Sequence, residues 1–152
     1  MLQLFYLGGK IMCIFCKIIN KEIPSYTIYE NDFVTCFLDI SQATKGHTLI
    51  VPKKHVQDIF SLEKKEAEEI MKAAVVVANV LKEKLGTKDI NLLNNSGQLA
   101  GQTVMHFHLH VLPRYENDEI DFHQVDHEPN FLELDKLYSC LLYTSDAADD
   151  LI

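Results

Sequence analysis

The sequence lacks an excess of positive charge and has no long apolar run. Among 152 residues, Lys and Arg total 14 while Asp and Glu total 22, which gives a formal net charge of −8. This balance argues against a protein that coats nucleic acid or lies on an anionic membrane surface, but it leaves room for a local phosphate site. No apolar run is long enough to cross a bilayer as a helix. We therefore expect no nucleic-acid partner and no membrane partner.

A secretory signal is also missing. Residues 1–11 contain a short apolar patch, but no basic region precedes it and no clear cleavage site follows. We expect Met12 to be the natural start and residues 140–152 to be a non-native tail, so that residues 12–139 form a single domain. The ordinary apolar content of 47% suits one soluble domain with its own core. A cytoplasmic location follows from the missing signal.

Cysteines are few, and without a secretory signal a disulfide framework is not expected. Cys13 and Cys16 form a C-x-x-C pair, a spacing that suits zinc or redox chemistry. With His55 and His106 they could complete a structural zinc site of two cysteines and two histidines. The alternative is a pair of ordinary buried cysteines near an N-terminal helix.

Hydrophobic periodicity and turn residues predict an α+β fold, a five-stranded antiparallel sheet with one long helix and a short N-terminal helix. Asn31-Asp32 marks a hairpin between the first two strands, Gly86 stops the long helix, and Pro113 ends the last strand. The predicted helices cover residues 13–21, 61–85 and 131–142, and the predicted strands cover residues 26–30, 33–38, 47–52, 90–94 and 103–112.

The most informative segment, residues 106–112, begins with three histidines that alternate with apolar residues. In an extended strand His106, His108 and His110 share one face, while the residues between them face a core. Three solvated or core histidines are the plain alternative, although stacked imidazoles stabilise a sheet poorly. A metal site, even a catalytic one that uses all three rings, and a histidine nucleophile that attacks phosphorus are the functional readings.

Phosphorus chemistry has its supporting groups nearby. A neutral imidazole can attack a phosphorus ester, provided that an acceptor holds its other nitrogen and fixes the tautomer. Thr103 supplies a hydroxyl, and Asn95 and Gln102 supply neutral donors in a loop where Gly97 and Gly101 allow close backbone approach. Taken singly, these loop residues also suit an ordinary polar loop.

Four blocks of the sequence resemble the histidine triad (HIT) family. The segment GQTVMHFHLHVLPR (101–114) matches the histidine signature of the family, with apolar residues between and after the histidines. The segments CIFCKIINKEIPS (13–25), FLDISQATKGHTLIVPKKH (37–55) and NNSGQLAGQ (94–102) match in the same order. The resemblance is closest to the Hint-like branch and to bacterial HIT hydrolases.

The resemblance implies a covalent mechanism. His108 matches the nucleophile, which would attack the α-phosphorus of a purine nucleotide and form a nucleotidyl-histidine that water then cleaves. His110 matches its phosphate-binding partner, and His47 matches an active-site histidine beside the nucleophile. Thr103 matches a hydroxyl near the leaving group. Phosphoramidates or dinucleoside polyphosphates are the implied substrates.

The resemblance also implies how a nucleotide, a metal and a second copy would bind. Asp39 matches the carboxylate that accepts the ribose hydroxyls, and Asn95 and Gln102 match phosphate contacts. Residues that match an apolar slot for a purine base, or else plain core, are Phe15, Ile18, Ile23, Phe37 and Ile40. Zinc-binding relatives imply structural zinc at Cys13, Cys16, His55 and His106, and the family implies a homodimer whose sheets join.

One feature qualifies the implied activity, and one alternative function stays open. Leu99-Ala100 stands where a more polar or glycine-rich loop is often found, which bears on contacts with the leaving group. A purine-nucleotide-binding sensor or scaffold with negligible turnover would keep every binding residue. The presence of His108, His110 and Thr103 favours the enzyme.

Overall fold

The computed structural model describes residues 6–7, 10–11 and 13–142. Met12 and the residues after 142, where the predicted start and most of the predicted tail fall, lie outside the described residues. The chain divides into two compact units, Met1–Ile120 and Asp121–Ile152. The first unit holds all the strands among the described residues, together with every predicted site residue.

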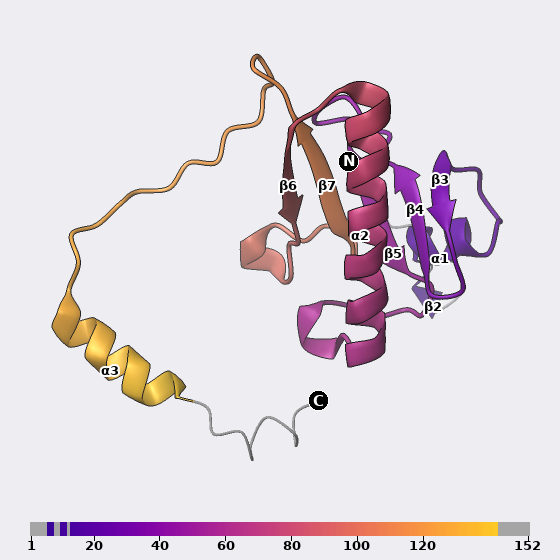
Figure 1. Ribbon diagram of the computed structural model, residues 1–152. Coiled ribbons are helices and arrows are strands. Elements are labelled where there is room, and N and C mark those ends of the chain that lie inside the picture. The colour runs from indigo at the N-terminus through magenta and orange to yellow at the C-terminus, as the bar shows by residue number, and fades with distance from the viewer. Residues whose placement is uncertain (1–5, 8–9, 12, 143–152) are drawn as a thin grey trace. The chain divides into compact units, whose positions relative to one another are not determined.

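The predicted five-stranded antiparallel sheet is confirmed, with strand order β3-β4-β5-β7-β6 (Figure 1). A separate two-stranded ladder pairs β1 with β2. The strands are β1 Tyr6–Leu7, β2 Lys10–Ile11, β3 Thr27–Glu30, β4 Val34–Leu38, β5 Thr48–Pro52, β6 Asp89–Leu93 and β7 Leu109–Arg114. The helices are α1 Ile14–Ile19, α2 Lys64–Leu85 and α3 Phe131–Leu141, with 3-10 turns at Ile59–Ser61 and Gln98–Ala100.

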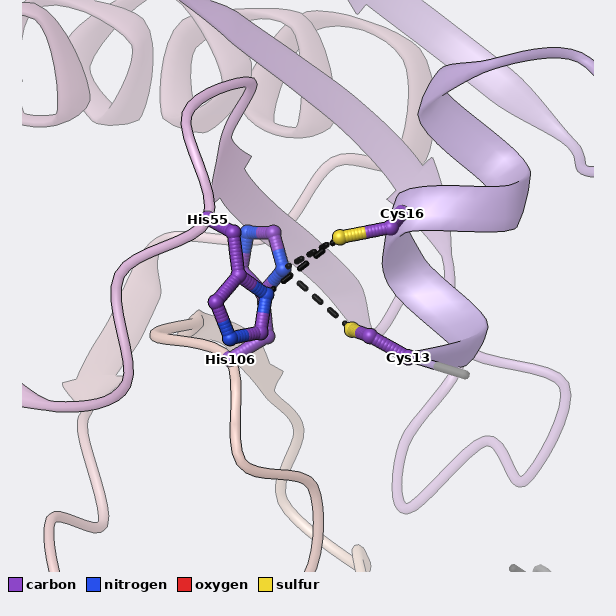
Figure 2. A group of neighbouring side chains, drawn as sticks. All are labelled: Cys13, Cys16, His55 and His106. Atoms are coloured by element: carbon purple, nitrogen blue, oxygen red, sulfur yellow. Dashed lines mark hydrogen bonds between the residues drawn. The ribbon is translucent and has the colours of Figure 1, made fainter. Parts of the chain in front are cut away.

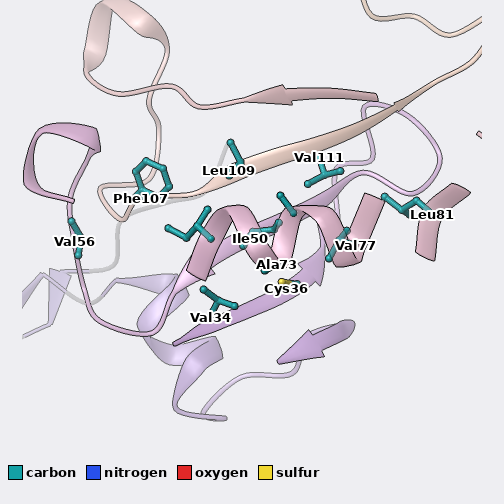
Figure 3. Close-up of a cluster of buried hydrophobic side chains, with 12 residues drawn as sticks. Val34, Cys36, Ile50, Val56, Ala73, Val77, Leu81, Phe107, Leu109 and Val111 are labelled. Atoms are coloured by element: carbon teal, nitrogen blue, oxygen red, sulfur yellow. The ribbon is translucent and has the colours of Figure 1, made fainter. Parts of the chain in front are cut away.

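Helix α2 covers one face of the sheet and forms the larger core with it (Figure 3). Its buried residues recur every three or four positions, so one stripe of the helix meets the sheet. The prediction that the residues between the histidines face a core is confirmed. This core comprises Val34, Cys36, Ile50, Val56, Ile70, Ala73, Ala74, Val77, Leu81, Phe107, Leu109 and Val111.

Helix α1 packs against the opposite face through a smaller cluster. Phe15 of this helix packs on Phe37, Leu49 and Val51 of the sheet. Because side chains alternate along a strand, Leu49 and Val51 face α1 while Ile50 between them faces α2. The centre of the sheet is therefore buried on both faces, and the α1 side is the one that carries the histidine cavity described below.

The start of the long helix is corrected by the structure. The prediction placed it at Ser61, but α2 begins at Lys64, after an extended residue, Glu63. The carboxylate of Asp58 instead accepts from the backbone N–H groups of Phe60 and Ser61, and so caps a short 3-10 turn. The end of the helix is as predicted, since Gly86 takes the left-handed conformation, with φ of 70°.

The last strand is also displaced from its predicted bounds of 103–112. β7 begins at Leu109, because the peptide before it bonds elsewhere: Phe107 N–H donates to the carbonyl of Val56, outside the ladder. At the other end, Pro113 does not end the strand but pairs with Ile90. β5 pairs only with residues 109–111 of β7, so Pro113 lies where one flank has no neighbouring strand and its missing N–H is tolerated.

The second unit contains α3, as the periodicity predicted. The side chain of Asn130 caps this helix by accepting from the N–H of Glu133. Residues 121–130 before it have no regular structure. Within the described residues, no helix is both long and apolar enough to cross a membrane.

Candidate active site

A cavity of about 490 Å³ lies on the α1 side of the sheet. Its mouth and walls include all five predicted base-slot residues, together with Asp39, Thr103, His108 and His110. The sequence prediction missed further lining residues that adjoin or alternate with the predicted ones, namely Ile14, Pro24, Ser25, Tyr26, Leu38, Leu49 and Val104. A largely apolar pocket with a few polar groups is typical of a small-molecule site.

His108 is buried beside this cavity with its tautomer fixed. Its Nδ1 atom lies 2.8 Å from the carbonyl oxygen of His106, which can only accept, so Nδ1 carries the proton. Nε2 therefore carries the lone pair. Burial lowers the pKa of His108, which keeps the ring neutral. Neutral charge and a free Nε2 lone pair are what a nucleophilic imidazole needs.

The side chains of His47 and His110 form a hydrogen-bonded pair, with His47 Nε2 2.8 Å from His110 Nδ1. The backbone N–H of Ala43 donates to His47 Nδ1 at 3.3 Å, which favours the tautomer of neutral His47 with its proton on Nε2, directed at His110; the backbone of Ser41 also hydrogen-bonds this ring. His110 then carries its own proton on Nε2. Burial first, and then the neighbouring His108 and His47, lower the pKa of His110 to about 4.

Asp39 lies next to this pair, although it is eight positions from His47 in the sequence. Its Oδ2 atom is 3.7 Å from His47 Nε2, and its Oδ1 atom accepts from the N–H of Ser41 at 2.7 Å. The carboxylate is partly buried and lines the cavity. It can therefore accept hydrogen bonds from a ligand in the pocket.

Neither of the predicted phosphate contacts in the 95–102 loop, Asn95 and Gln102, lines the cavity. Gln102 uses its whole amide within the protein: Nε2 donates to the carbonyls of Gln57 and Val104, and Oε1 accepts from Gly97. The Gln102 side chain thus shapes the loop, and the cavity lining includes neither it nor Asn95.

A neighbour of Asn95 was missed by the prediction. Nδ2 of Asn94 donates to the carbonyl of His108 at 3.0 Å and so fixes the backbone of that histidine. The sequence signal was a pair of consecutive asparagines at the end of a predicted strand. Neighbouring side chains on a strand point to opposite faces of the sheet, so the two were expected to have different surroundings.

The four predicted zinc ligands, Cys13, Cys16, His55 and His106, lie together (Figure 2). The Sγ atoms of Cys13 and Cys16 lie 3.4 and 3.6 Å from His106 Nδ1, and Cys16 Sγ lies 3.3 Å from His55 Nδ1. Tetrahedral zinc with nitrogen and sulfur ligands has ligand separations of about 3.5 Å. The residues present therefore fit a zinc ion.

The hydrogen bonding of His106 also suits a ligand. Its Nε2 lies 2.8 Å from the carbonyl oxygen of Pro52, so Nε2 carries the proton and the Nδ1 lone pair faces the sulfurs. Burial first, and then the nearby Cys13, raise the pKa of Cys16 to about 11. A bound cation would reverse this and favour the thiolate.

A second group, Asp39, His47 and His110, also brings three possible ligand atoms together. Its hydrogen bonding opposes a metal, because metal on His47 Nε2 would move the proton to Nδ1, where it would face the N–H of Ala43. Within residues 13–142, no group of possible ligand atoms includes all three triad histidines. The geometry therefore does not favour the reading in which all three bind one metal.

Known proteins share both the sequence and the fold. The family model described as the HIT domain matches residues 20–117. The Protein hit of Bacillus subtilis is 45% identical over 103 residues, covering 68% of this chain and 71% of its own. The adenosine 5'-monophosphoramidase of Saccharomyces cerevisiae is 35% identical over 138 residues, covering 90% of this chain and 85% of its own.

Solved structures agree. A HIT family protein from Bacillus anthracis is 47% identical with a TM-score of 0.80, over 85% of this chain and 94% of that one. A zinc-bound histidine triad family protein from Mycobacterium smegmatis is 32% identical with a TM-score of 0.69, over 84% of this chain and 96% of that one. With the sheet, the cavity and the histidine segment all in place, the chain belongs to the HIT domain family.

Proposed function

We propose that the protein is a nucleotide hydrolase or nucleotidyl transferase that works through a covalent nucleotidyl-histidine. The observation that carries this proposal is the fixed tautomer of His108, whose Nδ1 bonds the carbonyl of His106 beside the cavity. A carbonyl acceptor on Nδ1 leaves the other ring nitrogen as an uncharged nucleophile. The yeast relative named adenosine 5'-monophosphoramidase supports a substrate of the phosphoramidate class.

In the proposed reaction, His108 Nε2 attacks the α-phosphorus of a nucleoside phosphoramidate or dinucleoside polyphosphate. A bond forms between that nitrogen and phosphorus, and the bond from phosphorus to the leaving amine or phosphate breaks; a leaving amine takes up a proton from solvent, and the water of the second step returns one. Water then attacks the same phosphorus, which releases the nucleotide and restores His108. His110, whose Nε2 carries a proton, donates to a phosphate oxygen, and the Thr103 hydroxyl bonds the leaving group.

The apolar part of the cavity suits a purine base. Phe15 and Phe37 pack edge to face with ring centroids 5.6 Å apart, and the isoleucines of the slot line the same cavity. A flat, largely apolar base gains from such walls. We assign the ribose to Asp39, whose two oxygens can each accept from a hydroxyl group.

The decisive experiment follows AMP release from adenosine 5'-phosphoramidate by the wild type, by His108→Ala and by the tail variant His123→Ala. We expect release by the wild type and by His123→Ala, and its loss in His108→Ala. Wild-type protein quenched in alkaline denaturant, which preserves the acid-labile bond between nitrogen and phosphorus, should carry a nucleotidyl adduct on a peptide that contains His108. A wild type that binds AMP but releases none, even from dinucleoside polyphosphates, would instead support a nucleotide-binding sensor or scaffold.

We further propose that Cys13, Cys16, His55 and His106 hold a structural zinc ion. When bound, zinc would supply a cross-link between helix α1 and two distant segments, and no ligand exchange at the metal is needed for the reaction. The zinc-bound relative from Mycobacterium smegmatis and the ligand separations of this site support the assignment. Metal analysis of the purified protein should find one zinc ion per chain.

We also infer a homodimer in which the β6 edges of two copies pair. β6 is an edge strand, and Leu92 on it is 43% exposed. Unpaired edges with exposed apolar residues favour association. Leu92→Lys should therefore convert a dimer to a monomer in light scattering. Ile28→Lys, on the opposite edge strand β3 and 41% exposed, is the matched control and should leave the dimer intact.

A further inference from the structure

We propose that Gln42 is a positioning residue, which holds the loop of residues 39–47 so that a backbone amide of this loop fixes the tautomers of His47 and His110. The catalytic consequence rests on the function proposed above, whereas the effect on the tautomers does not. Gln42 is exposed and belongs to neither core cluster, so its role is local to the loop.

The side chain of Gln42 clamps both ends of its loop. Nε2 donates to the carbonyl of Asp39 at 2.6 Å and to the carbonyl of His47 at 2.7 Å, while Oε1 accepts from the N–H of Gly46 at 2.8 Å. The N–H of Asp39 also donates to the carbonyl of His47, at 3.0 Å. Both site residues at the loop ends are thus held by one carboxamide, which makes three hydrogen bonds within the loop.

Gln42 influences the tautomer of His47 through the next residue in the sequence. Ala43 comes directly after Gln42, and its N–H donates to His47 Nδ1. Because a peptide N–H can only donate, this contact favours the tautomer of His47 with its proton on Nε2, which lies 2.8 Å from His110 Nδ1, although the backbone of Ser41 also hydrogen-bonds the His47 ring. His110 therefore keeps its proton on Nε2, the state that can donate to a phosphate oxygen.

This ordering is sensitive to small displacements. The contact from Ala43 to His47 is 3.3 Å long, near the limit for an N–H donor, so a shift of the loop would break it. His47 could then carry its proton on either nitrogen. With the proton on Nδ1, His47 would accept from His110 instead of donating, and His110 would lose the proton on Nε2. Gln42 prevents this by holding the peptide that Ala43 shares with it.

The test measures tautomers directly, by nitrogen-15 NMR of the imidazole rings without nucleotide. We compare the wild type with Gln42→Ala, with Gln42→Glu and with Gln124→Ala, an exposed glutamine in the second unit. Gln42→Glu keeps an acceptor for Gly46 but cannot donate to either carbonyl. The wild type and Gln124→Ala should show protonated Nε2 on His47 and His110, and both Gln42 variants should show mixed tautomers.

The kinetic counterpart is a fall in kcat of about tenfold for both Gln42 variants, with KM changed less and the unfolding midpoint nearly unchanged. Wild-type tautomers in either Gln42 variant would overturn the proposal, as would a loss of activity that merely follows unfolding. If the proposed hydrolysis fails, the NMR result still decides the role of Gln42, since it needs no turnover.

Discussion

His47 Nε2 lies 2.8 Å from His110 Nδ1, in a site where neither ring readily accepts a further proton. Burial lowers the pKa of both rings, and their neighbours lower that of His110 further, to about 4. The pair is therefore held neutral across the physiological range. That state has consequences for the stability of the fold in acid and for activity.

Stability should fall as the pH drops from about 6.5 to about 4. In this window a histidine in the unfolded chain, with a pKa near 6.5, is protonated while His110 in the folded protein stays neutral. The unfolded state therefore binds more protons, and acid favours it. The contribution of His110 is at most about 3 kcal/mol, fully present above the unfolded pKa and lost once the pH reaches the folded value. Denaturant unfolding of the zinc-loaded protein at several pH values measures it.

The matched variants for that profile are His110→Asn and His123→Asn. Replacing His110 should reduce the slope of the free energy of unfolding against pH by an amount that corresponds to about one proton. Replacing the exposed His123 should leave the slope unchanged. An unaltered profile in His110→Asn would show that the acid sensitivity arises elsewhere.

Asn94→Asp should lower kcat by about tenfold and leave KM within about twofold, because only a donor can bond the carbonyl of His108 and so hold the nucleophile in place. Steady-state kinetics with a phosphoramidate measures the change. Asn79→Asp is the control for the added charge, since its amide bonds only the carbonyl of Val75 on helix α2. Equal losses in both variants would argue against a role for Asn94 at the site.

Removing zinc should loosen the N-terminal half of the first unit. Chelation, or Cys16→Ser, should lower the melting temperature by about 5–10 °C, because the ion would join α1 to the segments that carry His55 and His106. Calorimetry before and after chelation checks this. Cys140→Ser, in the exposed second-unit helix, should melt like the wild type, and insensitivity of the wild type to chelation would count against bound zinc.

Gly46→Ala should destabilise the fold by about 2 kcal/mol or more, for two reasons at one position. Its φ is +92°, and a Cβ atom there would lie 2.6 Å from Leu85 Cδ1. Gly86→Ala isolates the first reason, since φ is +70° but the space around it is open, and it should cost only about 1 kcal/mol. Urea unfolding compares them, and equal losses would exclude the steric contribution.

Much of the fold follows from local pattern. The alternation around the histidines and the periodicity of residues 64–85 are strong signals, so the sheet and the long helix were predictable. The predicted element boundaries that were wrong depend on contacts with residues outside the element. Helix α2 starts late because Asp58 caps a separate turn, and β7 starts late because the peptide of Phe107 bonds Val56 across the chain.

The candidate site shows the same division. The sequence predicted many of the residues that line the cavity and the residues of the cysteine–histidine cluster. It carried no information on which nitrogen of each histidine ring is protonated. The positions of Asn94 and Gln42 also required the structure, because both act through carbonyls of other residues rather than through a recognisable motif.

His106 serves two neighbours with two separate parts: its ring faces the sulfur of Cys13, and its carbonyl accepts from His108. Side-chain replacement can remove the first contact and keep the second, because every amino acid has a carbonyl. Inserting or deleting a residue between His106 and His108 would break the second contact, because it depends on the two-residue spacing. Replacing the side chain at position 106 therefore costs the contact with Cys13 but keeps the acceptor that orients His108, so the spacing of the two histidine positions is the stricter requirement.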